Sequence, residues 1–307
     1  MSRSRAVAVA RIVLAVLVLA AVVWAVARSW DEVSAELARV SAGALVTSSA
    51  LALLALVLTL VGWRALLADL GSPLGWGPAS GVLFIGQLGK YLPGTVWTVV
   101  VQTEVASAVG VPRKRTAVVG LLSMGLSALA GLGVGVFALP ALLSSGGESW
   151  YLLVLLVVPV GAVVLHPRVL NALVGRALRV VKRAPLDDRL SGRAIAVTMA
   201  AYVAAWLCLG LHVWVLVHDL GADGVGALVP AVLGYALAAS LGMVAVLLPA
   251  GIGLREAVLL LLLSGSLSRP GAAAAVVLLS RFIVTASDVV AAAAAWLYDR
   301  SHHFVTR

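Results

Sequence analysis

Charged residues are scarce in this chain, and their scarcity excludes a soluble globular fold. Asp, Glu, Lys and Arg make up 11% of its 307 residues, whereas a soluble domain has about 25%. Hydrophobic residues make up 62%, and the mean hydropathy is +1.10. The apolar runs are close to the about 20 residues that a helix needs to cross a bilayer, and the short alternating segments of a β-barrel are absent. We predict an all-α, polytopic integral membrane protein that forms a single membrane domain over residues 1–307.

Cysteine and the common catalytic motifs are also missing. Cys208 is the single cysteine, so the chain has neither an intramolecular disulfide nor a thiolate cluster for a metal. The five histidines show no ligand spacing. There is no Walker motif, nucleophile elbow or zinc-protease motif, and no polar segment is long enough for a soluble catalytic domain. We therefore expect a protein that is not an enzyme and that uses no cofactor and no metal.

The basic residues, which give the chain a net charge of +9, lie mainly in loops. They therefore indicate orientation in a membrane, and we expect no nucleic-acid partner. The largest basic cluster, 167–193, is predicted to be a cytoplasmic loop, together with 113–115 and 299–307. The amphipathic stretch 169–181 is expected to lie on the inner leaflet. Both termini are predicted to be cytoplasmic, in the cytoplasmic membrane of a bacterium.

Six apolar runs are predicted to be full spans, at 12–27, 44–67, 116–139, 150–165, 194–217 and 272–297. Residues 25–27 resemble a signal-peptidase site, so cleavage after the first run is an alternative. The connection 28–43 between the first two runs is predicted to be an external loop.

Two further apolar segments are interrupted by proline and glycine. The first carries Gly-Lys-Tyr-Leu-Pro-Gly-Thr-Val-Trp at 89–97, and the second carries Leu-Pro-Ala-Gly-Ile-Gly-Leu-Arg-Glu at 248–256. The arm 79–89 would span only about 16 Å as a helix, so we predict that 79–110 is a re-entrant hairpin from the cytoplasm. The segment 227–268 is predicted to form a second hairpin from outside, or two full spans. Opposed hairpins indicate an inverted repeat, with halves at about 44–166 and 194–298 joined by 167–193.

Charged residues inside these apolar segments are the candidates for a functional site, because a charge at membrane depth is costly. Six residues qualify by position: Lys90, Glu104, Arg255, Glu256, Arg281 and Asp288. Glu104 is about 15 Å from the first Pro-Gly tip and is therefore expected near the cytoplasmic rim. The neighbours Arg255 and Glu256 diverge by about 100° around a helix, so they are not expected to pair with each other. Arg281 and Asp288, about 10 Å apart in height, are expected to pair with hairpin residues.

A helix that restarts after a Pro-Gly break points its free amides and positive dipole end into the cavity at the break, which suits an anion such as phosphate. Lys90, Arg255 and Arg281 would add full positive charges, and Glu256 and Asp288 would hold these cations or exchange with the substrate. The predicted binding residues are Lys90, Tyr91, Pro93, Gly94, Arg255, Glu256, Arg281 and Asp288. The alternatives are that both Pro-Gly segments are simple helix kinks and that Arg281 and Asp288 form structural ion pairs.

The two interrupted stretches, 89–97 and 248–256, resemble the flippase-like transmembrane domain of bacterial lysylphosphatidylglycerol synthases, with Ala250 in place of the usual glycine. The resemblance covers nearly the whole chain. In full-length members this domain moves an aminoacylated phospholipid between leaflets, and a separate soluble domain, absent here, makes that lipid. The resemblance therefore implies a stand-alone lipid translocator without synthase activity.

We expect a translocator of an anionic, phosphate-headed lipid, either a phospholipid or a polyprenyl phosphate, with membrane lipids as its substrate. One alternative is a secondary transporter of a small anionic or amphiphilic solute, whose path would be enclosed rather than open to lipid. Another is a non-transporting membrane partner of a separately encoded lipid-modifying enzyme.

Overall fold

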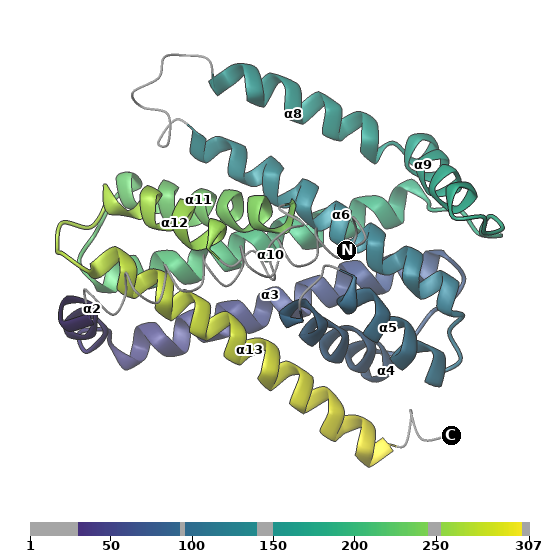
Figure 1. Ribbon diagram of the computed structural model, residues 1–307, viewed down its shortest axis with the longest axis horizontal. Helices are drawn as coiled ribbons and strands as arrows, with labels where there is room; N and C mark the ends of the chain where they lie inside the picture. The colour runs from purple at the N-terminus through teal and green to yellow at the C-terminus, as the bar shows by residue number, and fades with distance from the viewer. Residues whose placement is uncertain (1–29, 93–95, 140–149, 245–252, 303–307) are drawn as a thin grey trace, which may run out of the picture.

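The computed structural model describes residues 30–92, 96–139, 150–244 and 253–302. Over these ranges the chain is helical and contains no strand, which confirms the predicted all-α class. The helices pack into a bundle, and α13 crosses it diagonally in Figure 1. The predicted first span, 12–27, lies outside the described residues, as do the tips of both Pro-Gly segments.

The chain order of the elements is α2 (Trp30–Leu37), α3 (Ala42–Asp69), α4 (Trp76–Ser80), the π-helix η1 (Gly81–Ile85), the 3-10 helix η2 (Leu88–Tyr91), α5 (Trp97–Ala108), α6 (Arg113–Gly135), the 3-10 helix η3 (Val136–Ala138), α8 (Trp150–Leu165), α9 (Pro167–Val180), α10 (Gly192–Asp219), α11 (Val225–Val244), α12 (Leu254–Ser264) and α13 (Ala272–His302). Five described helices are long and apolar enough to cross a membrane, namely Ala42–Asp69, Arg113–Ala138, Gly192–Asp219, Val225–Met243 and Ala272–Arg300. This agrees with a multi-pass membrane protein. Helix α8 has 16 residues, or about 24 Å, which is shorter than about 30 Å of hydrocarbon. The number of full spans therefore stays a prediction.

The first interrupted segment differs from the regular helical arm expected over 79–89. It consists of α4, η1 and η2, which are short turns of three different types. Close packing on α5 explains the irregularity, because a Cβ at Gly89 would lie 2.6 Å from the Thr98 backbone nitrogen and one at Gly86 would lie 2.3 Å from Gln102 Cγ. Helix α11 is instead continuous over 20 residues, which is long enough for a full span. Re-entry of either segment stays a prediction.

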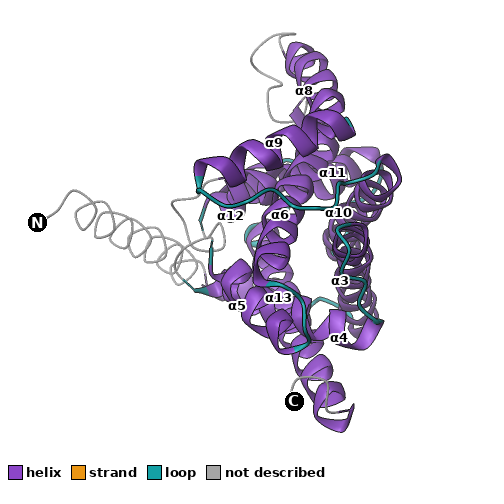
Figure 2. Ribbon diagram, turned by 90° about the vertical axis from the view of Figure 1, so that its right-hand side faces the viewer, coloured by secondary structure: helices purple, strands orange, loops and turns teal. Residues whose placement is uncertain are grey.

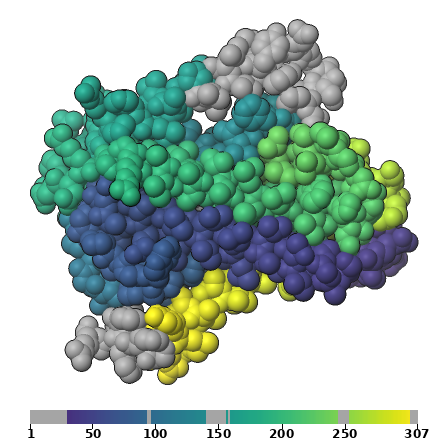
Figure 3. Space-filling model, turned by 180° about the vertical axis from the view of Figure 1, so that it is seen from behind, coloured from purple at the N-terminus to yellow at the C-terminus, as the bar shows by residue number. Residues whose placement is uncertain are grey.

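Two long spanning helices of equal length, α3 and α10, cap each other. Each has 28 residues and begins after a serine N-cap. The backbone N–H and the hydroxyl of Ser41 both donate to Asp219 at 2.7 Å. At the other end, the N–H and hydroxyl of Ser191 donate to Asp69 at 2.6 and 2.9 Å. The last residue of each helix thus binds the first turn of the other, so the two helices run antiparallel, as the purple-blue and green bands of Figure 3 show.

The same reciprocity recurs inside the α3–α10 pair. The Ser48 hydroxyl donates to the carbonyl of His212 at 2.9 Å, and the Thr198 hydroxyl donates to the carbonyl of Gly62 at 3.1 Å. The two donors, Ser48 and Thr198, are 150 positions apart in the sequence, and so are the two acceptors, Gly62 and His212. The same separation relates the two capping serines to each other and the two terminal aspartates to each other. This regular, antiparallel correspondence is the pattern that an inverted repeat produces. The predicted limits of the halves, 44–166 and 194–298, stay a prediction.

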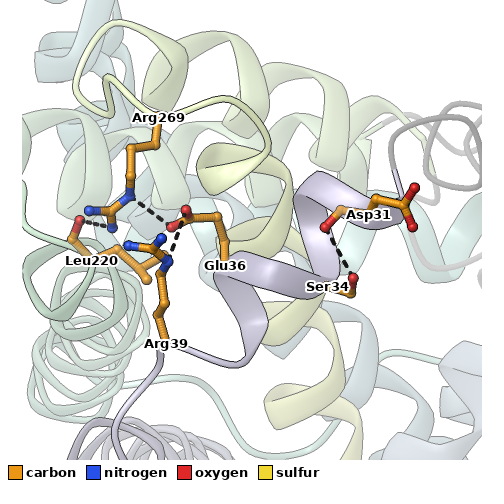
Figure 4. A network of polar contacts seen from close by, with 6 residues as sticks. All are labelled: Asp31, Ser34, Glu36, Arg39, Leu220 and Arg269. Atoms are coloured by element: carbon orange, nitrogen blue, oxygen red, sulfur yellow. Dashed lines mark hydrogen bonds and ion pairs between the residues drawn. The ribbon is translucent and has the colours of Figure 1, made fainter.

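A buried carboxylate fixes the segment that precedes α3. The sequence predicts a loop over 28–43, but residues 30–37 form α2, which carries Glu36 with 4% of its surface exposed. Arg269 donates to Glu36 at 3.0 Å and to the carbonyl of Leu220 at 2.6 Å, and Arg39 approaches Glu36 at 3.5 Å (Figure 4). The network joins α2 to the end of α10 and to the connection before α13.

Removing this carboxylate should destabilise the protein. Glu36→Ala should lower the stability by about 1–3 kcal/mol, because Arg269 loses its buried acceptor. Arg39→Ala is the matched control, since its side chain is 58% exposed and should contribute less than about 0.5 kcal/mol. Thermal unfolding of the two purified variants in detergent measures the difference, and equal shifts would contradict the structural role of Glu36.

The basic connection contains the amphipathic helix that the sequence predicts. Helix α9 buries Leu170 and Leu178 and exposes its three arginines, Arg168, Arg176 and Arg179. Together with α8 it lies at one side of the bundle, at the top of Figures 1 and 2. Its placement on the inner leaflet stays a prediction.

Candidate functional site

A cavity of about 260 Å³ lies inside the bundle. Helices from both parts of the chain line it, namely α3, η1, η2, α5, α6, α10, α11, α12 and α13. Lys90, Tyr91, Arg255, Arg281 and Asp288 all line this one cavity. The structure therefore brings together residues that the sequence separates by as many as 198 positions.

The first charged cluster of the cavity is built around Asp288. Lys90 Nζ lies 2.7 Å from Asp288 Oδ2, and the Tyr91 hydroxyl donates to the same oxygen at 2.6 Å. The 3-10 turn of η2 places these two neighbouring side chains against one carboxylate of α13. The Asp288 side chain is 1% exposed, whereas that of Lys90 is 32% exposed. The Lys90 ammonium is therefore accessible from the cavity, and the buried Asp288 carboxylate fixes its position through the ion pair.

The second charged cluster is built around Glu256. Its Oε1 lies 3.4 Å from Arg281 Nη1, and its Oε2 accepts the backbone N–H of Gly253 at 2.8 Å. The second contact caps the N-terminus of α12, and Gly253 has the positive φ of 92° that glycine tolerates. The N–H of Gly253, one of the backbone amides after the break that were predicted to bind an anion, thus already donates to Glu256.

Arg255 projects to a different place, as predicted for its divergence from Glu256. Its guanidinium lies over the ring of Tyr235, 4.8 Å from the centroid. Tyr235 is 1% exposed and packs edge-on against His212, with ring centroids 5.0 Å apart. His212 in turn contacts the Ser280 hydroxyl at 2.9 Å. This buried stack fixes the ring that carries the Arg255 charge.

Two buried rings of the site, Tyr235 and His212, are not among the residues predicted from the sequence. The only signal for Tyr235 is an aromatic side chain in an apolar span next to a charged stretch, and such a residue is ordinarily part of the core. His212 has no second ligand at metal spacing, and no group of three or more His, Cys, Asp or Glu that could hold a metal occurs among the described residues.

Uncharged polar residues form another part of the cavity wall. Thr98 and Gln102 of α5 and Ser123 of α6 contribute to it, and the Ser123 hydroxyl contacts the Tyr202 hydroxyl at 2.5 Å. The two charged clusters hold two cations (Lys90 and Arg281) and two carboxylates (Asp288 and Glu256). Arg255, over the Tyr235 ring, adds a third cation, which leaves one net positive charge.

The other predicted site residues fall outside this arrangement. Pro93 and Gly94 lie outside the described residues. Glu104 pairs with Arg113 at 2.7 Å, and both side chains are more than half exposed, which agrees with its predicted place at the rim. The predicted pairing of Arg281 and Asp288 with the interrupted segments is confirmed, with Glu256 and Lys90 as their respective partners.

The sequence model of a family described as "Lysylphosphatidylglycerol synthase TM region" matches residues 11–292, which is almost the whole chain. No curated protein matches it.

Proposed function

The chain belongs to the family of the lysylphosphatidylglycerol synthase transmembrane region, and on this basis we propose that it moves an anionic, phosphate-headed lipid between the two leaflets of a membrane. The family ties the chain to membrane lipids. The observation that carries the anionic headgroup is the gathering of Lys90, Arg255 and Arg281 around one cavity inside the bundle.

The charge of the cavity suits such a headgroup. Guanidinium groups bind phosphate oxygens through charge-assisted hydrogen bonds, and lysine adds a compact positive charge. With Glu256 and Asp288 ionised, the net charge of +1 is neutralised by one phosphodiester group. An unpaired buried cation would cost several kcal/mol, so the two carboxylates keep Lys90 and Arg281 compensated while no lipid is bound.

Two exchanges let the headgroup bind. The phosphate replaces Asp288 as the partner of Lys90 and replaces Glu256 as the partner of Arg281. The 3.4 Å separation of Arg281 and Glu256 is longer than the about 2.7–2.9 Å of a strong charge-assisted bond, so this pair is the easier one to open. No covalent step is needed, and we propose that the chain has no synthase activity.

Lipid translocation in vesicles tests the function. Protein reconstituted in phosphatidylcholine vesicles should speed the transfer of fluorescent phosphatidylglycerol between leaflets, measured by quenching of the outer leaflet with dithionite. Protein-free vesicles give the background, and fluorescent phosphatidylcholine, whose headgroup has no net charge, should move more slowly. If neither phospholipids nor polyprenyl phosphates moved faster than in protein-free vesicles, the proposal would be wrong.

The cavity volume gives some support to a second function. A volume of about 260 Å³ is slightly below the about 300–1,000 Å³ of ligand pockets, so it can hold a headgroup but not two acyl chains. In the lipid mechanism the chains stay in the bilayer. A transporter of a small soluble phosphate ester would fit the same volume, and uptake of radiolabelled glycerol phosphate into the vesicles would identify it.

Replacing Tyr235 tests whether the ring positions the Arg255 charge. Tyr235→Leu should weaken the binding of an anionic lipid about threefold to tenfold, which corresponds to the worth of one partly desolvated cation–π contact. Tyr235→Phe keeps the ring and should lose no more than about twofold. Both affinities can be measured by titrating short-chain phosphatidylglycerol into purified protein. An equal loss in the two variants would show that the hydroxyl, and not the ring, matters.

A further inference from the structure

Among the charged residues of the site, Asp288 is the one with a buried oxygen that lacks a hydrogen-bond partner in the described ranges; the uncharged Gln102 of the cavity wall has another such oxygen, Oε1. The Oδ2 of Asp288 receives both Lys90 and Tyr91, whereas its Oδ1 is buried and has no hydrogen-bond partner among the described residues. An ionised carboxylate can accept about four hydrogen bonds, and a buried acceptor without a partner is unfavourable. This oxygen therefore requires a physical explanation.

When a phosphate replaces Asp288 as the partner of Lys90, the ionised form of Asp288 becomes less favourable. Once a phosphate takes Lys90, the carboxylate keeps only the Tyr91 hydroxyl, and it faces a second negative charge in the same cavity. A buried, unpaired carboxylate is avoided in proteins by neutralisation. A proton on Oδ1 removes the negative charge and turns the unpartnered acceptor into a hydroxyl.

We propose that Asp288 is a proton-binding site linked to lipid binding, so that one proton and one anionic headgroup enter the cavity together and leave it together. The inference rests on the proposed function. In the step, the Lys90–Asp288 ion pair opens, a Lys90–phosphate pair forms, and one proton from water binds Asp288 Oδ1. A monoanionic headgroup and a proton together add no net charge.

The charged and titratable neighbours single out Asp288 for this role. Lys90 and Tyr91 of η2 contact it, and Arg281 of α13, Arg255 of α12 and Tyr235 of α11 line the same cavity. Behind these residues, Glu256 of α12 contacts Arg281 and His212 of α10 packs against Tyr235. Helices α3, α5 and α6 and η1 present only uncharged side chains to the cavity. Asp288 is the one carboxylate among the described residues that line the cavity. Both oxygens of Glu256, which contacts Arg281, already have partners, whereas Asp288 has an oxygen that can take a proton.

The surroundings favour a proton over a metal cation. Lys90 Nζ already lies 2.7 Å from the other oxygen of the same carboxylate, and a sodium or divalent ion would need several further oxygen ligands. No cluster of three acidic or other ligating side chains occurs in the described ranges. Sodium dependence nevertheless enters the test as an outcome.

The direction of the pH effect follows from linkage. Binding that takes up a proton weakens as the pH rises, by up to about tenfold per pH unit while Asp288 is ionised in the free protein and protonated in the complex. The affinity for short-chain phosphatidylglycerol should therefore fall as the pH rises in wild-type protein.

The experiment measures lipid affinity and proton uptake together. Wild-type protein in zwitterionic detergent should take up about one proton per phosphatidylglycerol bound, measured with a pH-sensitive dye in weakly buffered solution. Asp288→Asn should bind the lipid with no pH dependence and no proton uptake. Glu104→Gln, at the exposed rim, should behave as wild type. If Asp288→Asn fails to fold, proton uptake by the wild-type protein alone decides the matter.

Several results would overturn the inference. Binding of phosphatidylglycerol by wild-type protein without pH dependence or proton uptake would contradict it and leave the proposed function intact. Binding that depends on sodium at constant pH, without proton uptake, would assign Asp288 to a metal cation instead. If phosphatidylglycerol bound no better than phosphatidylcholine at any pH, the proposed function itself would fail.

Discussion

Lys90→Ala should reduce the translocation of an anionic lipid by about 10- to 150-fold. The variant removes the cation that reaches the cavity, and a charge-assisted bond to phosphate is worth about 1.5–3 kcal/mol. It also leaves Asp288, with a side chain 1% exposed, as a buried charge without its cation, which should lower the stability by about 3–5 kcal/mol. Dithionite quenching in vesicles measures the first effect, and thermal unfolding in detergent measures the second.

A double variant separates these two effects. In Lys90→Ala/Asp288→Ala both members of the ion pair are gone, so most of the lost stability should return. Translocation should stay low, because the cation is still missing. Lys114→Ala is the matched control, since this lysine donates to the carbonyl of Pro185 in an exposed contact at 2.7 Å. Normal translocation by a folded Lys90→Ala protein would refute the assignment of Lys90 to the binding site.

Arg281→Ala should weaken the binding of an anionic lipid by about 10- to 100-fold, at about 1.4–2.8 kcal/mol for a lost guanidinium–phosphate contact. Glu256 would keep its contact with the Gly253 N–H, so α12 should stay capped and the protein folded. Arg281→Lys should recover only part of the affinity, because lysine lacks the planar, forked donor arrangement of arginine. Titration of short-chain phosphatidylglycerol compares the variants.

The control for Arg281 lies on the same helix. Arg300→Ala removes an exposed arginine that stacks on Trp296 near the end of α13, 4.7 Å from the ring centroid. It should leave the lipid affinity unchanged within about twofold. If Arg281→Ala bound the lipid as well as Arg300→Ala does, Arg281 would be part of a structural ion pair only.

The charged residues of the site could be predicted from the sequence because an apolar background makes each charge conspicuous. Lys90, Arg281 and Asp288 are expensive at membrane depth, and their need for partners leads directly to the observed pairs. Their role in binding stays a prediction. Tyr235 and His212 could not be identified in this way, since an uncharged ring in an apolar helix looks the same whether it supports Arg255 or fills the core.

The backbone was less accessible to prediction. The irregular course of α4, η1 and η2 depends on glycines that allow close contact with α5. The spacing of apolar residues along the sequence does not indicate which glycines contact another helix, so this contact could not be predicted. Helix α2 escaped prediction because its stability comes from Glu36 and from Arg269, which is 233 positions away. Long spans such as α3 and α10 were found to within a few residues, since their apolar length alone defines them.

The reciprocal capping of α3 and α10 has a consequence for synthesis of the protein. Asp69 leaves the ribosome 122 residues before Ser191, its capping partner. At about 5–20 residues per second, α3 waits about 6–24 seconds in the membrane before its C-terminal contact can form. Ser41 waits longer, because Asp219 is 178 residues away. Both contacts that join the ends of α3 to α10 therefore form only after the ribosome has made α10, so α3 must stay helical until then without them.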